Sequence, residues 1–351
     1  MLDVKLDDFK PKILDNKERW NDWYLVVNFE HEKTEYLLTW IIAEGTLMGG
    51  SAIRLALSSD PFQPKIAGEI KVLESPIKEI MINKTQKQSA FKYIENENSI
   101  SVEMDDLSVT CNQKEMKFLS KNDNISGELT CYPRGPFFWW GNERNAECNL
   151  TERSNLSGVE ILSDIKGMIK VDGKEIEVNG SGVFERLWIR ALDFLKIRFE
   201  DWIYANFDNM YTFLCHVEST SKDGRAGHYE TGTLYLINED DYLFAKEITF
   251  IPSNWIFIKD AYRFIPMTQR VKVLTDKGIL KLKTTYSLYP QIIGQPMRIE
   301  NLTMNHITGW NLMFYDIPFT VEGKFTYNNG KKIKLENGRG LNNVVRNFPL
   351  Y

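Results

Sequence analysis

The sequence contains few of the residues that build metal centres and disulfide frameworks. Its four cysteines show no CxxC spacing, and its four histidines form no HxH or HExxH pattern. These spacings argue against a structural zinc site, and we expect the chain to use no metal and no other cofactor. The cysteines are Cys111, Cys131, Cys148 and Cys215, and the histidines are His31, His216, His228 and His306.

Long apolar runs and an excess of basic residues are also missing. No segment of about 18 uncharged apolar residues occurs, and the first ten residues alternate apolar and charged side chains. We therefore expect neither a transmembrane helix nor an export signal, and a cytoplasmic protein with reduced thiols. The net charge of -5 argues against a basic surface, so nucleic acid is not an expected partner.

Aromatic side chains, in contrast, are abundant, at 13% of the residues with nine Trp and fifteen Tyr. That bias favours a β-rich fold or a large apolar pocket. A chain of 351 residues exceeds what one hydrophobic core usually fills, which predicts two domains.

Short runs of alternating apolar and polar residues follow one another through the first half. They predict consecutive antiparallel strands, and strands this short and this close together indicate a barrel or a sandwich. The runs are 20–29, 36–43, 52–57, 77–82, 90–94, 100–104, 107–111, 116–119 and 125–131. Residues 1–19 show no period and are expected to form a lead-in arm. Residues 185–202 have near-helical spacing, which predicts a short helix connecting two halves.

The second half of the chain repeats the first. Asp22-Trp23-Tyr24 recurs as Asp201-Trp202-Ile203, and the turn Asp172-Gly173 recurs as Asn329-Gly330. The glycine pair Gly180 and Gly182 recurs in the same way as Gly338 and Gly340. Matches at both ends of each half predict a duplicated all-β unit, of the size of a small antiparallel barrel that can hold one apolar ligand. The predicted domains are 1–193 and 194–351.

The stretch 135–188 carries the strongest functional candidates. Four consecutive aromatic residues at 137–140 are followed directly by polar ones, and the Asp172-Gly173 turn predicts that this stretch shares one sheet with the strand of Glu185. Polar groups among buried aromatics need partners, which makes Asn142, Glu143, Arg144, Glu185 and Arg186 candidates. A packed aromatic core with salt bridges at its rim would give the same pattern.

Several short motifs resemble the carotenoid 1,2-hydratase (hydroxyneurosporene synthase) and AttH-like family, and together they span most of the chain. They are Asp22-Trp23-Tyr24, Gly182-Val183-Phe184-Glu185-Arg186-Leu187-Trp188, Trp202-Ile203-Tyr204, Asp223-Gly224, Tyr315-Asp316-Ile317 and Gly338-Arg339-Gly340. The resemblance implies two lipocalin-like barrels in tandem. Glu185 stands where the family usually has Asp, and Asn343 stands at its C-terminal acidic position, so the resemblance does not carry over a specific substrate.

Hydration of a carbon–carbon double bond needs a proton donor, stabilisation of a cation and a positioned water. A carboxyl group with a raised pKa supplies the proton, and aromatic faces stabilise the cation. Glu185 is the candidate acid with Arg186 as its neighbour, and His228, or His216, is the candidate second base. Glu185 could equally form an ion pair with Arg186 or Arg144, and a lone His on a strand is often structural.

Three classes of function remain open. One is a hydratase, lyase or isomerase acting on a terpenoid, polyene or lipid-like metabolite, and another is a cyclase that uses a shaped pocket with hydrogen-bond donors. The third is a lipid or isoprenoid carrier without chemistry. The partner in each case is an apolar small molecule, collected by transient contact with a membrane, and the oligomeric state stays open. The predicted site is an elongated apolar cavity near the join of the domains, formed by Trp139, Trp140, Trp188, Trp202, Tyr204, Glu185, Arg144 and Asn142.

Overall fold

The chain divides into two compact units. Unit 1 comprises residues 1–59, 77–148 and 155–192, and unit 2 comprises residues 60–76, 149–154 and 193–351. The division into domains at residues 1–193 and 194–351 remains a prediction. The residues that the computed structural model describes are 4–12, 19–45, 49–58, 65–67, 70–72, 77–86, 91–135, 137–191, 196–220, 226–258, 263–286, 291–293 and 314–346.

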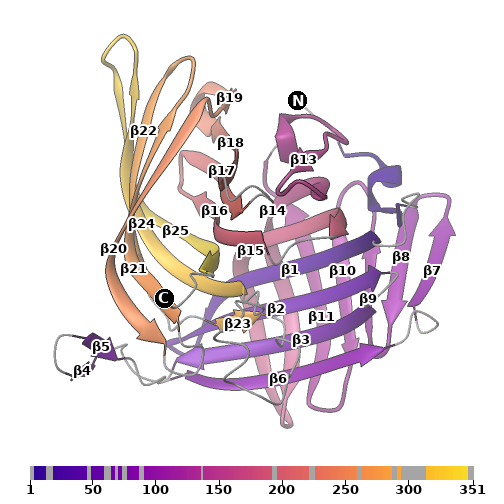
Figure 1. Ribbon diagram of the computed structural model, residues 1–351. Helices are drawn as coiled ribbons and strands as arrows, with labels where there is room; N and C mark the ends of the chain where they lie inside the picture. Colours follow the sequence, from indigo (N-terminus) through magenta and orange to yellow (C-terminus); the bar gives the residue numbers. More distant parts are fainter. Residues whose placement is uncertain are drawn as a thin grey trace. The chain divides into compact units, whose positions relative to one another are not determined.

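Unit 1 is built on an antiparallel sheet whose first strand lies beside its last (Figure 1). The strand order is β6-β3-β2-β1-β15-β14-β11-β10-β9-β8-β7, and both β12 and β13 pair with β14. The strands are β1 (Arg19–His31), β2 (Thr34–Gly45), β3 (Gly49–Ser58), β6 (Ile77–Gln86), β7 (Phe91–Asn96), β8 (Ser99–Met104), β9 (Leu107–Cys111), β10 (Met116–Lys121), β11 (Ile125–Pro133), β12 (Phe138–Trp139), β13 (Cys148–Asn149), β14 (Ser154–Val171) and β15 (Lys174–Ala191).

Unit 2 repeats this arrangement, with the order β19-β18-β17-β16-β25-β24-β22-β21-β20-β5-β4 and with β23 paired to β24. In unit 1 β1 lies between β2 and β15, and in unit 2 β16 lies between β17 and β25. The prediction of two tandem lipocalin-like antiparallel β-barrels is confirmed. The strands are β4 (Lys65–Ala67), β5 (Ile70–Val72), β16 (Ile197–Asn206), β17 (Met210–Thr220), β18 (Ala226–Leu236), β19 (Asp241–Phe244), β20 (Glu247–Ile258), β21 (Arg263–Leu274), β22 (Gly278–Tyr286), β23 (Gln291–Ile293), β24 (Phe314–Tyr327) and β25 (Lys332–Arg346).

The two predicted tight turns occupy equivalent places in the two units. Asp172 and Gly173, with φ of 49° and 83°, join β14 to β15, and Gly330, with φ of 88°, lies in the turn that joins β24 to β25. Positive φ is the conformation that a two-residue hairpin turn requires, and Asp and Gly tolerate it. Asp172-Gly173 therefore forms the two-residue turn of the last hairpin in unit 1, and Gly330 supplies the positive φ in the longer connection, residues 328–331, of unit 2.

The predicted helix over 185–202 is wrong. Glu185 to Ala191 belong to β15, and Ile197 to Trp202 belong to β16; residues 192–195 lie outside the described residues. Leu187 and Trp188 point to opposite faces of β15, and both side chains are buried. Because both faces of the strand are buried, apolar residues need not alternate with polar ones. The spacing of the apolar residues over 185–202 therefore resembled that of a helix. The described residues contain no α-helix and only short 3-10 helices, η1 (Leu6–Phe9), η3 (Trp140–Asn142) and η5 (Ile237–Glu239).

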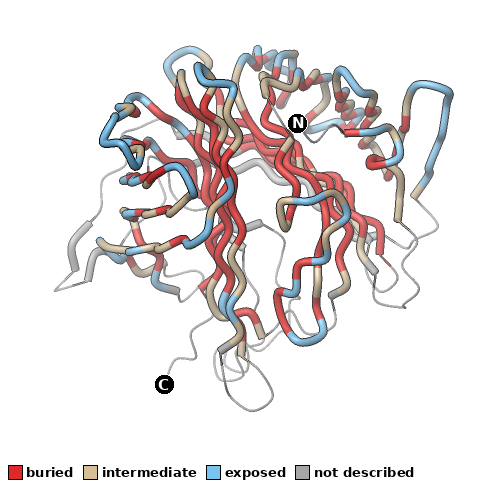
Figure 2. Tube along the Cα trace, turned by 90° about the horizontal axis from the view of Figure 1, so that it is seen from above, coloured by how far each residue is buried: buried red, intermediate tan, exposed pale blue. Residues whose placement is uncertain are grey.

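Aromatic rings fill the inner face of the unit 1 sheet. Phe118 packs edge-on against both Trp40 and Phe184, with ring centroids 5.1 Å and 5.5 Å apart. Phe9, in the first residues of the chain, stacks on Phe184 at 6.1 Å and is 1% exposed. Part of the expected lead-in arm is therefore packed into the core. Figure 2 shows continuous burial along the central strands, with exposure gathered at the hairpin ends.

The four cysteines are buried free thiols. Burial raises the pKa of both Cys111 and Cys131, which makes their thiolates scarce at neutral pH. As for membrane crossing, none of the helices in the described residues is both long enough and apolar enough to span a bilayer.

Candidate functional site

Three neighbouring strands of unit 1, β1, β15 and β14, carry most of the predicted site residues. Trp23 of β1 pairs with Arg186 of β15, and Trp139 of β12 pairs with Val159 of β14. Trp23, Trp139 and Val159 all belong to the buried apolar core. Because side chains alternate along a strand, Glu185 and its neighbour Arg186 point to opposite faces of the sheet.

Arg186 lies on the inner face and is fully buried. Its guanidinium donates hydrogen bonds to the main-chain carbonyls of Lys10 (2.6 Å) and Asp22 (3.2 Å) and to Oδ1 of Asn21 (2.8 Å). It also stacks on the Trp23 ring, with Cζ 4.1 Å from the centroid. Burial lowers the pKa of Arg186 to about 9, which leaves the group protonated at neutral pH. These contacts assign Arg186 to holding the first residues of the chain against the sheet.

The opposite face of the same strands holds a group of carboxylates. Asp22 pairs with Leu187 on the adjacent strand, and Gly158 lies against Leu187 from the other side. Gly158 and Leu187 are therefore neighbours on the adjacent strands β14 and β15. Two residues further along each strand, this antiparallel register places Glu160 of β14 opposite Glu185 of β15. Asp22, Glu160 and Glu185 therefore share one face, which we call the carboxylate face.

Asp22 has the most perturbed carboxyl group of this face. Its side chain is 8% exposed, and Oδ1 is buried without a hydrogen-bond partner among the described residues. Burial raises the pKa of Asp22 to about 7; Arg186 opposes this shift, and the nearby Glu160 adds to it. A carboxyl group in this state is protonated in a large fraction of molecules at neutral pH and can act as an acid.

Glu185 and Glu160 lie on β15 and β14, both on the same side of Asp22 along the sheet, and they differ in exposure. Glu160 is 1% exposed and accepts a hydrogen bond of 2.6 Å from Nε1 of Trp140. Glu185 is half-buried and lies beside Tyr24, its pairing partner on β1. Trp140 therefore contributes to the carboxylate face, whereas its neighbour Trp139 belongs to the inner core.

Of the remaining predicted residues of unit 1, Trp188 and Arg144 contact the inner core, whereas Asn142 and Glu143 are more exposed. Trp188 is 7% exposed and stacks with Arg186 at 5.5 Å. Arg144 lies 5.1 Å above the Trp139 ring and approaches Oδ2 of the buried Asp8 with Nε at 3.4 Å. Asn142 is partly exposed, has a φ of 65° and ends η3, and Glu143 is exposed. The predicted aromatic group is thus divided between the two faces of the sheet.

The other three predicted residues belong to unit 2. Trp202 and Tyr204 are buried on β16, with ring centroids 5.9 Å apart. His228 is exposed on β18 and lies beside His216 of β17, with ring centroids 4.8 Å apart. His216, Glu218 and His228 form the cluster of the described residues that could hold a metal ion. Sequence reasoning missed this cluster, although the motif His-x-Glu occurs twice, at 216–218 and 228–230.

A buried polar network on β16, β21, β22 and β25 of unit 2 was also missed. Asp201 receives hydrogen bonds from Arg346 (2.9 Å to each carboxylate oxygen), from Gln269 (2.7 Å) and from Asn342 (2.7 Å). Asn342 also donates to the hydroxyl of Tyr286 at 2.8 Å. All five side chains are buried, so the network fixes the core of unit 2 through polar contacts rather than through apolar packing alone.

A smaller and a larger hollow in the described residues are lined by none of the predicted aromatics. The smaller, of about 10 Å³, lies beside Ser51 and Asp105 in unit 1. The larger, of about 330 Å³, lies over β22, β24 and β25 of unit 2 and has a polar rim that includes Lys283, Glu322 and Arg339. The elongated apolar cavity near the domain join stays a prediction.

Several solved structures share this fold. A protein assigned provisionally as AttH from Nitrosomonas europaea is 14% identical, with a TM-score of 0.65 over 99% of this chain and 97% of that one. Kievitone hydratase from Nectria haematococca is 10% identical, with a TM-score of 0.59 over 93% and 88%. CghA, solved with Sch210972, is 8% identical, with a TM-score of 0.57 over 94% and 89%. No family model and no curated protein sequence matches the chain. At these identities the likeness shows the fold.

Proposed function

We propose that this protein binds an apolar small molecule and hydrates, isomerises or cyclises it, with a carboxyl group of the carboxylate face as the proton donor. The observation that carries the proposal is Asp22, a buried carboxyl whose pKa is raised to about 7 and whose Oδ1 has no partner among the described residues. Sequence reasoning gave this role to Glu185. The proposal keeps Glu185 on the same face and assigns the donated proton to Asp22.

Acid-catalysed hydration accounts for the residues of this face. The protonated carboxyl transfers its proton to one carbon of a double bond, which leaves a cation on the other carbon. Water adds to that cation and returns a proton to the carboxylate, so the acid is regenerated. Negative charge on Glu160 and Glu185 and the ring of Trp140 would stabilise the cation. An acid with a pKa near the working pH is best suited to both proton transfers.

Likeness in fold to a protein named as a hydratase supports this class of reaction, although fold alone does not carry an activity. The substrate class is terpenoid, polyene or lipid-like, and a carotenoid, which the sequence resemblance implied, is one candidate within it. Transient contact with a membrane would give the protein access to such a substrate.

The test uses the small molecules that co-purify with the protein from its native source, identified by mass spectrometry and then incubated with the purified protein in D₂O. A hydratase gives a product heavier by one water, with one deuterium bound to carbon. Asp22→Asn should abolish this product, because an amide cannot donate the proton, while the bound molecule is retained. Asp123→Asn, which changes an exposed acid of the same unit, should leave turnover intact.

Glu185→Gln separates the two carboxyl groups. Turnover that is lost in Glu185→Gln and kept in Asp22→Asn would return the acid role to Glu185. A product without carbon-bound deuterium would indicate a cyclase that transfers no proton from solvent. Recovery of every co-purified molecule unchanged would refute the enzyme and leave a carrier.

A further inference from the structure

Two His-x-Glu motifs on adjacent strands of unit 2 form a compact group of four side chains. The antiparallel register of β17 and β18 pairs His216 with Glu230 and Glu218 with His228. Residues two apart on a strand share a face, so all four side chains point to the same side of the sheet. The group therefore consists of two imidazoles and two carboxylates at the corners of a square. Each histidine has one glutamate two residues away on its own strand and the other glutamate as its pairing partner on the adjacent strand.

Glu230 holds both imidazoles through one oxygen. Its Oε1 lies 3.1 Å from Nδ1 of His216 and 3.1 Å from Nε2 of His228, while its Oε2 accepts a hydrogen bond of 3.1 Å from the main-chain N–H of Ile248. A carboxylate oxygen only accepts, so Glu230 favours the tautomer in which Nδ1 of His216 and Nε2 of His228 carry the proton, while in the metal-free protein Glu218 competes for a proton on Nε2 of His216. A metal ion would displace any proton on the other nitrogen of each ring, and Nε2 of His216 and Nδ1 of His228 would then be the lone-pair donors.

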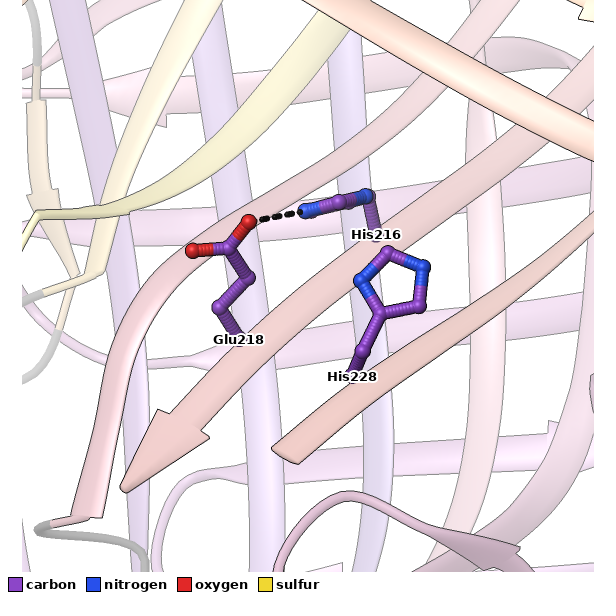
Figure 3. A group of neighbouring side chains, drawn as sticks. All are labelled: His216, Glu218 and His228. Carbon is purple, nitrogen blue, oxygen red and sulfur yellow. Dashed lines mark hydrogen bonds and ion pairs between the residues drawn. The ribbon is translucent and has the colours of Figure 1, made fainter. Parts of the chain in front are cut away.

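Glu218 faces those two ring nitrogens. Its Oε1 lies 3.2 Å from Nε2 of His216, and Figure 3 shows the ring of His228 beside this contact, with a ring nitrogen turned toward it. One ligand atom from each of His216, Glu218 and His228 lies within 4.8 Å of the others. Ligand atoms around a tetrahedral zinc ion are about 3.3 Å apart, given metal–ligand bonds of about 2.0–2.1 Å. The His216–Glu218 distance already has this value, and rotation of exposed side chains can bring His228 in.

We propose that His216, Glu218 and His228 bind a divalent first-row transition metal ion, with Zn²⁺ as the reference ion. Glu230 orients both histidines from outside the coordination sphere, as carboxylates commonly do behind zinc-bound histidines. Two neutral imidazoles and two carboxylates carry a charge of about −2, which one divalent ion balances. Three protein ligands leave a fourth position for water or another small ligand.

Burial suits this role. The His216 and Glu230 side chains are only 10% and 18% exposed and fix the site, whereas those of Glu218 and His228 are 48% and 55% exposed and leave a path for the ion. The rings of Phe199 and Phe250 pack edge-on against His216 at 5.6 Å and 5.7 Å and restrict its rotation. The site lies in unit 2 and the carboxylate face in unit 1, so this inference is independent of the proposed function.

The test is a Zn²⁺ titration by calorimetry on the whole chelator-treated protein at pH 7.5, with Mg²⁺ as the oxygen-preferring comparison ion. We expect one Zn²⁺ per chain and no comparable binding of Mg²⁺. His228→Ala and Glu218→Gln change exposed side chains and should each weaken Zn²⁺ binding at least about tenfold, and Glu230→Gln should weaken it about 10- to 100-fold. His31→Ala, which removes a histidine of unit 1, is the matched control and should bind like the wild type.

Two results would overturn the proposal. One is the absence of saturable Zn²⁺ binding, or equal affinity in the wild type, His228→Ala and Glu218→Gln once circular dichroism has shown that all three are folded. The other is a thiolate charge-transfer band in the spectrum of the Co²⁺ form, which would assign the ion to cysteine instead.

Discussion

Replacement of Asp22 by Asn should make the protein more stable, and the gain should depend on pH. Folding raises the pKa of Asp22 from 3.8 to about 7 because the side chain is buried. Well below pH 3.8 the group is protonated in both the folded and the unfolded chain and has no effect. As the pH rises from 4 to 7, the unfolded chain loses this proton while the folded chain keeps it, so folding becomes less favourable. Above pH 7 the penalty is constant.

The magnitude follows from the two pKa values. A difference between 3.8 and about 7, at about 1.4 kcal/mol for each tenfold change in proton affinity, corresponds to a penalty of about 4 kcal/mol at pH 8. Asn has nearly the same shape and cannot ionise, so Asp22→Asn removes this penalty. The free energy of unfolding of the variant should exceed that of the wild type by up to about 4 kcal/mol at pH 8, and the excess should fall below about 1 kcal/mol at pH 4.

Urea unfolding of both proteins at half-unit steps from pH 4 to pH 8 gives this difference, since the titrating groups that do not interact with Asp22 cancel in the comparison. Hydrogen exchange of the β1 and β15 amides reports the same quantity for unit 1 alone if the two units unfold separately. Asp123→Asn controls for the loss of one acidic group. A difference between Asp22→Asn and the wild type that stays constant across this range would refute the raised pKa, and with it the acid role of Asp22.

Two further changes probe the buried charges of the two units. Arg346→Met leaves the carboxylate of Asp201 buried without its ion pair and should lower the free energy of unfolding, measured in urea, by about 3–5 kcal/mol. The double variant Asp201→Asn/Arg346→Met should lose clearly less stability, and equal losses in the two variants would argue against the pair. Arg186→Leu removes the donors to the carbonyls of Phe9 and Lys10, so the amide of Lys10 should exchange faster with solvent, and unchanged exchange there would contradict the role given to Arg186.

Most strands could be predicted from the sequence because their patterns are local. Runs such as Leu107–Cys111 alternate buried and partly exposed residues, which is the pattern of a strand with one covered face. The turns at Asp172-Gly173 and Asn329-Gly330 were recognisable because few residues tolerate positive φ. The helix over 185–202 was predicted wrongly because both faces of β15 are buried there, so that no alternation survives.

The repeat was visible in the sequence, but its register was not. Gly182 pairs with Val27 in unit 1, and Gly340 pairs with Ala205 in unit 2. If Gly182 and Gly340 are equivalent, so are their partners Val27 and Ala205. Four residues before these partners, Trp23 of unit 1 is then equivalent to Asp201 of unit 2, whereas alignment of the two Asp-Trp pairs would make Asp22 equivalent to Asp201. The glycines are better markers than the Asp-Trp pairs because a Cβ at Gly182 would lie 1.9 Å from the carbonyl oxygen of Val26.

The candidate site was predicted only in part. Placing Glu185 in one sheet with the aromatic stretch was right, but nothing local marks Asp22 as buried, because its burial depends on what covers the second face of β1. Trp139 and Trp140 are adjacent in the sequence and yet belong to different faces. The His-x-Glu repeat, by contrast, was readable, since a spacing of two places both side chains on one face of a strand.

The pairing of each unit's first strand with its last has a consequence for how the chain folds during synthesis. Arg186 and Asp22 are 164 residues apart, and Arg346 and Asp201 are 145 apart, yet each pair is joined by hydrogen bonds. At a translation rate of about 5–20 residues per second, β1 waits on the order of ten seconds or more for its partner. During that time one hydrogen-bonding edge of β1 is open to neighbouring nascent chains, and closure of so long a loop is slow. Yield in cells should therefore depend on chaperones that shield this edge until the ribosome has released β15.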